Sequence, residues 1–104
     1  MTTSKRAVLE SPMTQGTSES IAYGFNFATL GTPTSSPGVQ LWNMNSGAAC
    51  TGTGYLNGTS ALSAGTVTTP YVLGLSVGVR YRLVCQAVIN SATISNYVDL
   101  IGEL

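Results

Sequence analysis

The chain has 104 residues and a formal net charge of zero, and only 8% of its residues are charged, against about 25% in an ordinary soluble domain. Four Lys and Arg residues argue against the dense basic surface that phosphate binding requires, so we expect no nucleic-acid partner. No apolar run could cross a membrane as a helix, and no apolar leader opens the chain, so we expect cytoplasmic synthesis and no membrane.

Residues 1–17 are polar and contain Pro12 and Gly16, which predicts an extended N-terminal arm with at most one short strand, near residues 7–9. We place one domain over residues 18–104. Two interpretations of the arm stay open: a frayed end, or a segment that contacts a neighbouring subunit. The arm residues that would make such a contact are Lys5, Arg6, Val8 and Leu9.

The stretch SESIAYGFNFATL, residues 18–30, alternates between apolar and small side chains. Ile21, Tyr23, Phe25 and Phe27 share one side, which predicts a strand with one buried face. The segment Gly31–Gly38 is dense in turn-forming residues, and we expect it to be a linker that ends this strand.

The middle of the chain predicts a hairpin, Val39–Met44 and Ala48–Leu56, around a turn at 45–47. Trp42 is its largest side chain, available either to the core or to an interface. Thr66–Leu75 predicts a strand pair or one bent strand, which Pro70 should keep out of the middle of a sheet.

The last two strands, Val79–Ile89 and Ile94–Ile101, predict an antiparallel hairpin with Asn90 and Ser91 as its two-residue turn. In that register Arg82 faces Asp99, the one acidic residue of the region. The inward face would carry Asn96 opposite Cys85, where an amide needs hydrogen-bond partners.

The outward side of this hairpin carries Val84, Val88 and Tyr97, and it is more apolar than a solvated face requires. A small contiguous patch of this kind indicates a contact surface. We therefore take these three residues as candidate interface residues.

Catalytic and metal-binding groups are scarce, because the chain has no His, four acidic residues and two Cys. Proton transfer and thiol nucleophiles both need a base that this composition does not supply. We expect no enzymatic activity, no cofactor and no metal site. Without a secretion signal we also expect Cys50 and Cys85 to be free, buried thiols rather than a disulfide.

No helical periodicity persists for three turns, and roughly seven short strands follow one another at spacings of about ten residues. This pattern predicts an all-β, antiparallel β-sandwich. A small barrel or a fragment of a jelly roll is the alternative.

The segment Leu75–Leu83, with Gly78 at its bend, resembles the entry into the F strand of fibronectin type III and immunoglobulin-like domains. In those families a tyrosine near the start of that strand bonds back to the upstream backbone. The resemblance implies this role for Tyr81, with Leu75, Gly78 and Trp42 as further structural positions.

A wider likeness covers about residues 18–104. The segments LWNMNSGAAC and TVTTPYVLGLSVGVRYRLVCQAV, followed by a short final strand, resemble small immunoglobulin-like structural proteins of tailed bacteriophages. The resemblance implies an immunoglobulin-like sandwich located in the virion, first as a head decoration or cement protein. Its implied partners are the major capsid protein and copies of itself.

Two alternatives remain open. The first is a neck (head–tail connector) or tail component, whose partners would be neck or tail proteins. The second is a module that binds the host surface or a glycan through loops such as Thr51–Ser63, where Tyr55 is the one aromatic residue.

Overall fold

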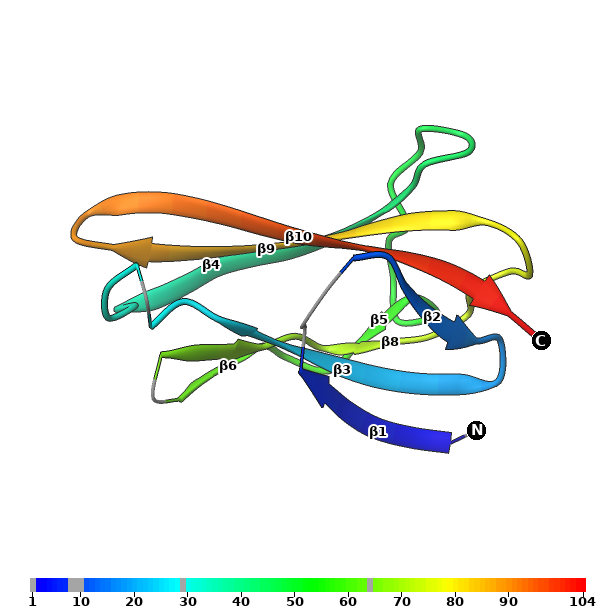
Figure 1. Ribbon diagram of the computed structural model, residues 1–104, viewed down its shortest axis with the longest axis horizontal. Helices are drawn as coiled ribbons and strands as arrows, with labels where there is room; N and C mark the ends of the chain where they lie inside the picture. The colour runs from blue at the N-terminus through cyan, green and yellow to red at the C-terminus, as the bar shows by residue number, and fades with distance from the viewer. Residues whose placement is uncertain (1, 8–10, 29, 64) are drawn as a thin grey trace.

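The computed structural model describes residues 2–7, 11–28, 30–63 and 65–104, and of residues 2–7, 36 and 37 only the backbone is described. These residues form ten β-strands and no helix (Figure 1). The strands are β1 (Thr2–Ala7), β2 (Met13–Gly16), β3 (Glu19–Asn26), β4 (Ser35–Asn43), β5 (Leu56–Asn57), β6 (Ala61–Ser63), β7 (Thr66–Thr68), β8 (Tyr71–Val72), β9 (Arg80–Ile89) and β10 (Ala92–Glu103). The fold is all-β, as the sequence predicts.

The strands form two sheets, which lie one above the other in Figure 1. The first sheet has the order β5-β8-β3-β7-β6, and β1 pairs in parallel with the other side of β3. The second sheet has the order β2-β10-β9-β4, in which β2 runs parallel to β10 and the other neighbours are antiparallel. This arrangement is compatible with a β-sandwich. The two parallel pairs differ from the antiparallel sheets that the sequence predicts, because periodicity identifies a strand but not the direction of its partner.

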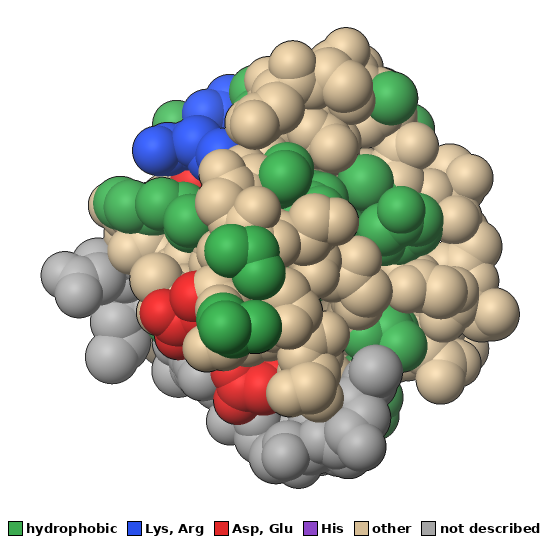
Figure 2. All heavy atoms as spheres, turned by 90° about the vertical axis from the view of Figure 1, so that its right-hand side faces the viewer, with side chains coloured by type: hydrophobic (Ala, Val, Ile, Leu, Met, Phe, Trp, Pro, Cys, Tyr) green, Lys and Arg blue, Asp and Glu red, His purple; other side chains and the backbone are tan. Residues whose placement is uncertain are grey.

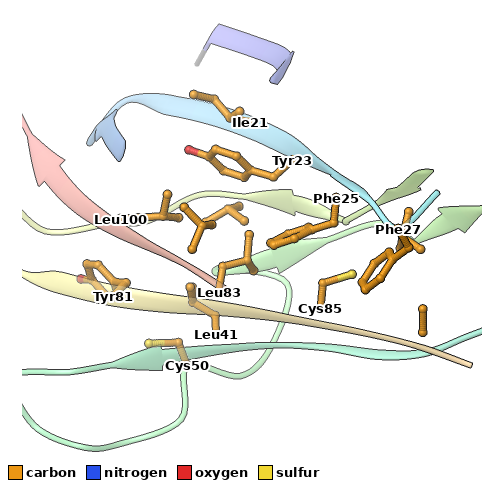
Figure 3. Packing of buried hydrophobic residues seen from close by; sticks show 14 of the residues in the cluster. Ile21, Tyr23, Phe25, Phe27, Leu41, Cys50, Tyr81, Leu83, Cys85 and Leu100 are labelled. Atoms are coloured by element: carbon orange, nitrogen blue, oxygen red, sulfur yellow. The ribbon is translucent and has the colours of Figure 1, made fainter. Parts of the chain in front are cut away.

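The core lies between the two sheets and receives side chains from both (Figure 3). Ile21, Tyr23 and Phe25 of β3 are at most 3% exposed, and Phe27 just beyond the strand is fully buried. The inward face expected for this strand is therefore confirmed. The second sheet contributes Leu41, Tyr81, Leu83, Cys85, Val98 and Leu100.

The N-terminal segment contributes one strand to each sheet of its own chain. β1 pairs with β3 in the first sheet, and β2 pairs with β10 in the second. The prediction of at most one short strand in residues 1–17 is therefore wrong, because both segments pair with strands far away in the sequence. The expected position near residues 7–9 falls mostly outside the described part, which leaves out residues 8–10.

The segment around Pro70 occupies a different place from the one the sequence predicts. β7 and β8 lie inside the first sheet, with β3 on one side and β6 and β5 on the other. Pro70 falls in the gap between these two strands, so no ladder bond requires its missing N–H. Thr69 connects this gap to β3, because its N–H donates to the Tyr23 carbonyl at 2.8 Å and its Oγ1 accepts from the Tyr23 N–H at 3.0 Å.

Interruptions of this kind also explain why the described residues form ten strands where the pattern indicated about seven. β5, β6, β7 and β8 are each two or three residues long. Turns and the Pro70 gap divide what the sequence pattern reads as longer segments.

β4 and the loop after it differ from the predicted hairpin. β4 begins at Ser35, inside the expected linker Gly31–Gly38, and passes Pro37 with a register shift against β9. An edge strand tolerates this proline, because no neighbour requires its N–H. The returning segment contacts β4 through one isolated bridge, from Trp42 to Ala49, rather than as a full strand.

The register predicted for the last hairpin is confirmed over its whole length. Arg82 pairs with Asp99, and the turn residues Asn90 and Ser91 have φ values of 50° and 64°, as a tight two-residue turn requires. Asn96 is indeed opposite Cys85, but its side chain is exposed and therefore hydrated.

A buried glutamine, which the sequence analysis missed, connects the two sheets. Gln15 of β2 has no exposed surface, and its Nε2 donates to the Val72 carbonyl of the opposite sheet at 2.6 Å. Its Oε1 accepts a hydrogen bond from the Tyr23 hydroxyl at 2.7 Å. A four-residue strand gives no alternation long enough to reveal an inward polar residue, so only the packing identifies it.

Candidate functional site

The surface of the second sheet that faces away from the core is the best-defined candidate for a functional site. Along β9, every second residue from Tyr81 to Ile89 is buried and the intervening residues are partly exposed. The pairing with β4 and β10 places further residues on the same surface. We call this surface the outer face; it comprises Gln40, Trp42, Arg82, Val84, Gln86, Val88, Ser95, Tyr97 and Asp99.

A carboxylate bound by two guanidinium groups lies at one end of the outer face. The Asp99 side chain is 4% exposed, and Arg82 Nε donates to its Oδ1 at 2.8 Å. Arg80 Nε donates to Oδ2 at 2.9 Å. The hydrogen bond from Arg82, and then that from Arg80, lowers the pKa of Asp99, while the hydrogen bond to Asp99 raises the pKa of Arg82. The cluster therefore stays ionised and carries one net positive charge at neutral pH.

Aromatic side chains flank this cluster. The guanidinium carbon of Arg82 lies 4.2 Å from the centroid of the Tyr97 ring, a cation–π contact, and Tyr97 is 54% exposed. Trp42 pairs with Arg82 from the other side, on β4, and its Nε1 donates to Gln40 Oε1 at 3.3 Å. Trp42 is thus a partly exposed outer-face residue, while Leu41 takes the core position beside it.

Only some of the predicted interface residues lie on the outer face. Val84 pairs directly with Tyr97, and Val88 lies further along the same strand; both valines are partly buried. Lys5 and Arg6 belong to β1, in the other sheet, and only their backbone is described. Val8 and Leu9 lie outside the described residues.

Figure 2 views the end of the molecule where β10 finishes. The described arginine side chains gather there in one cluster, and hydrophobic side chains form separate small patches among uncharged atoms.

Three of the four structural positions named from the sequence lie at the entry to β9, and Trp42 lies on the outer face instead. The Tyr81 hydroxyl accepts a hydrogen bond from the Ser76 N–H at 3.0 Å, and Leu75 beside it is buried. Gly78 has a φ of 76°, which favours glycine, and its N–H donates to the Gly102 carbonyl of β10 at 2.9 Å. This loop therefore fixes the start of β9 against β10.

Two surface hollows accompany the sheets. One, of about 390 Å³, lies between β4 and the following loop and is bordered by Trp42, Cys50 and Leu56. The other, of about 440 Å³, lies on the first sheet next to the Pro70 gap. Uncharged residues line it, among them Asn57, Thr59, Ser63, Thr68 and Tyr71.

The titratable groups described above are not arranged for acid–base or nucleophilic chemistry. Both cysteines are free and buried; burial raises the pKa of Cys85 to about 12 and also raises that of Cys50. A thiol that stays protonated at neutral pH is a poor nucleophile. Asp99, in turn, is occupied by two arginines.

Among the residues that the structure describes, no group of three or more His, Cys, Asp and Glu side chains could hold a metal ion. The same residues contain no helix long and apolar enough to cross a membrane. Comparisons with protein-family models, with curated proteins and with solved structures find no match.

Proposed function

We propose that this chain is a non-enzymatic structural protein of a bacteriophage virion with an immunoglobulin-like sandwich, and more specifically a head decoration protein. The strand orders support the fold assignment. The run β1-β3-β7-β6 corresponds to the order ABED of an immunoglobulin domain, and β4-β9-β10 corresponds to CFG. The bond from Ser76 to Tyr81 occupies the place of the tyrosine corner.

Three features depart from the immunoglobulin pattern. β1 and β2 pair in parallel with β3 and β10, whereas the sheets of an immunoglobulin domain are antiparallel. The cysteine pair that joins the two sheets in antibody domains has no counterpart, because Cys50 lies in a loop and both thiols are free. Trp42 lies on the outer face rather than in the core. The proposal therefore concerns the sandwich architecture and not the antibody subfamily.

The observation that carries the proposed function is the outer face. It combines a half-exposed aromatic ring, partly buried valines and two arginines, of whose two positive charges Asp99 neutralises one. Aromatic and arginine side chains are the residues that protein–protein contacts favour. Such a face is suited to contact with another protein. We infer that the chain acts by burying surface area against the capsid shell, which stabilises the shell without any catalytic turnover.

Binding to particles tests this proposal. Purified chain is added to capsids that lack it, and the bound amount and the resistance of the particles to heat are measured. We expect Tyr97→Ser to weaken binding about tenfold or more, as loss of a central aromatic contact does. The matched control is Val77→Ser, because Val77 is similarly exposed, at 58%, but lies in the loop before β9.

Electron cryomicroscopy of the particle decides the location. Density for this sandwich on the head shell supports decoration, and density at the neck or tail keeps the virion function and overturns the head assignment. Absence of the chain from the particle, or equal binding by the two variants, contradicts the proposal.

A module that binds glycans is the second candidate, and the hollow beside Pro70 favours it. The lining is uncharged, rich in hydroxyl and amide groups, and includes the aromatic ring of Tyr71. Saccharides bind through hydroxyl hydrogen bonds and contact with aromatic faces. Binding of the chain alone to host cells or to immobilised glycans, lost in Tyr71→Ala and kept in Tyr97→Ser, would favour this function over assembly.

A further inference from the structure

One side of β10 is only partly covered. β2 pairs with β10 from Leu100 to Glu103 and no further. Over Ala92–Val98, β10 has β9 on one side and, in the described part of the chain, no strand on the other. We call this stretch the open edge.

The backbone of the open edge directs hydrogen-bonding groups outward at alternate residues. The Asp99 N–H donates to Ser11 Oγ at 2.9 Å, and the Glu103 carbonyl accepts from the Thr17 N–H at 2.9 Å, both on the β2 side. Gly102, by contrast, bonds with Val79 on the β9 side. Because this orientation alternates along a strand, the odd-numbered residues of the open edge also direct N–H and C=O groups outward. These residues are Thr93, Ser95 and Tyr97.

The other sheet edges each carry a feature that discourages pairing with another chain. β1 contains Lys5 and Arg6, and β4 contains Pro37 and a register shift. β2, β5 and β6 are four, two and three residues long. Charges, proline, bulges and shortness are the devices by which proteins protect edges from other strands. The open edge has none of them: its sequence, ATISNYV, holds no charge, proline or glycine, and its register against β9 is unbroken.

We propose that the open edge pairs in antiparallel fashion with the same edge of a second copy of this chain. With the two-fold axis at Ser95, Thr93 of one copy faces Tyr97 of the other, and each outward N–H meets a carbonyl. An identical, self-complementary edge is what a two-fold interface requires. The second sheet then continues across the two copies, and the two outer faces form one surface.

Charge and shape favour a second copy as the occupant. The open edge carries no charge and the chain has a formal net charge of zero, so like edges approach without repulsion. The hairpin extends past the first sheet (Figure 1), and the side chains of Ser95, Asn96 and Tyr97 are exposed, so nothing in the described chain blocks a neighbouring strand. This pairing does not depend on the proposed place in a virion.

Charge substitutions at the two-fold axis test the proposal. The wild-type chain, Ser95→Glu, Ser95→Lys and an equimolar mixture of the two variants are compared by sedimentation velocity from micromolar to millimolar concentration. We expect a concentration-dependent wild-type dimer, and a dissociation constant at least about tenfold higher in each variant alone, since paired strands place the Cβ atoms of the two like-charged residues about 5 Å apart. The mixture should restore association, because Glu then faces Lys.

The control variant is Thr53→Glu, which adds the same charge at an exposed loop residue. It should dimerise like the wild type. Amide hydrogen exchange of the wild type gives a second readout that needs no substitution: the Thr93, Ser95 and Tyr97 amides should gain protection as concentration rises.

A chain that stays monomeric at all concentrations overturns the proposal. So does association that Ser95→Glu leaves unchanged, or a mixture that fails to restore it, because the contact would then involve another surface or another protein.

Discussion

Gln15 offers the sharpest test of how the two sheets are held together. Its side-chain amide is fully buried between them, and its bonds reach the Val72 carbonyl at 2.6 Å and the Tyr23 hydroxyl at 2.7 Å. Gln15→Met keeps the volume and removes the hydrogen bonds. The Val72 carbonyl then loses a donor inside the core, which costs about 1–3 kcal/mol, and the lost bond to Tyr23 adds about 1 kcal/mol.

We therefore expect Gln15→Met to lower the free energy of unfolding by about 2–4 kcal/mol. Urea denaturation measures this change, and the melting temperature should fall by roughly 10 °C or more. Gln40→Met is the matched control, because Gln40 is exposed, and it should change stability by about 0.5 kcal/mol or less.

A double-mutant cycle with Tyr23→Phe isolates the bond between the two side chains. The two substitutions together should cost less than the sum of their separate effects, by about 1 kcal/mol. If Gln15→Met is as stable as the control, the amide does not connect the sheets and the reasoning is wrong.

Three further substitutions test other contacts. Tyr81→Phe should lower stability by about 1–2 kcal/mol in a denaturant titration, because the Ser76 N–H loses its acceptor; an unchanged midpoint would remove this role. Gly102→Ala should destabilise by about 2 kcal/mol or more, since a Cβ there would collide with the Ser76 carbonyl, whereas Gly54→Ala, in open space, should be nearly neutral in the same titration. Asp99 has a lowered pKa, so its contribution to stability is complete above the ordinary aspartate pKa and is lost as the pH falls through the folded-state value. Asp99→Asn should therefore lower the free energy of unfolding at neutral pH and make that free energy fall less as the pH is lowered. A pH dependence of stability equal to that of the wild type would argue against the ion pair.

The strands with long alternation could be predicted from sequence because burial of one face imposes a period of two. This period identified the inward residues of β3, and together with a two-residue turn it fixed the β9–β10 register. Arg82 and Asp99 were paired correctly for the same reason. Very short strands, such as β5 to β8, show no such period, and their division at Pro70 depends on a side-chain bond from Thr69.

The candidate site was predictable in outline and not in detail. Val84, Val88 and Tyr97 were placed on one surface by alternation alone. Trp42 lies on the same surface because Leu41, its neighbour on β4, takes the inward position. Both residues are apolar, so the local sequence pattern does not show which of the two is buried. The bond from Arg80 to the same carboxylate likewise depends on side-chain conformation, because Arg80 lies diagonally from Asp99 rather than opposite it.

Periodicity and turn residues, which are local in the chain, were enough to predict an all-β chain, the inward face of its central strand and the pairing of its last two strands. The folded chain alone shows that β1 and β2 join different sheets, that Gln15 is buried between them, and that β10 has an open edge among the described residues. Those features depend on contacts between segments far apart in the chain, and residue spacing carries no information about which distant backbone group a side chain will meet.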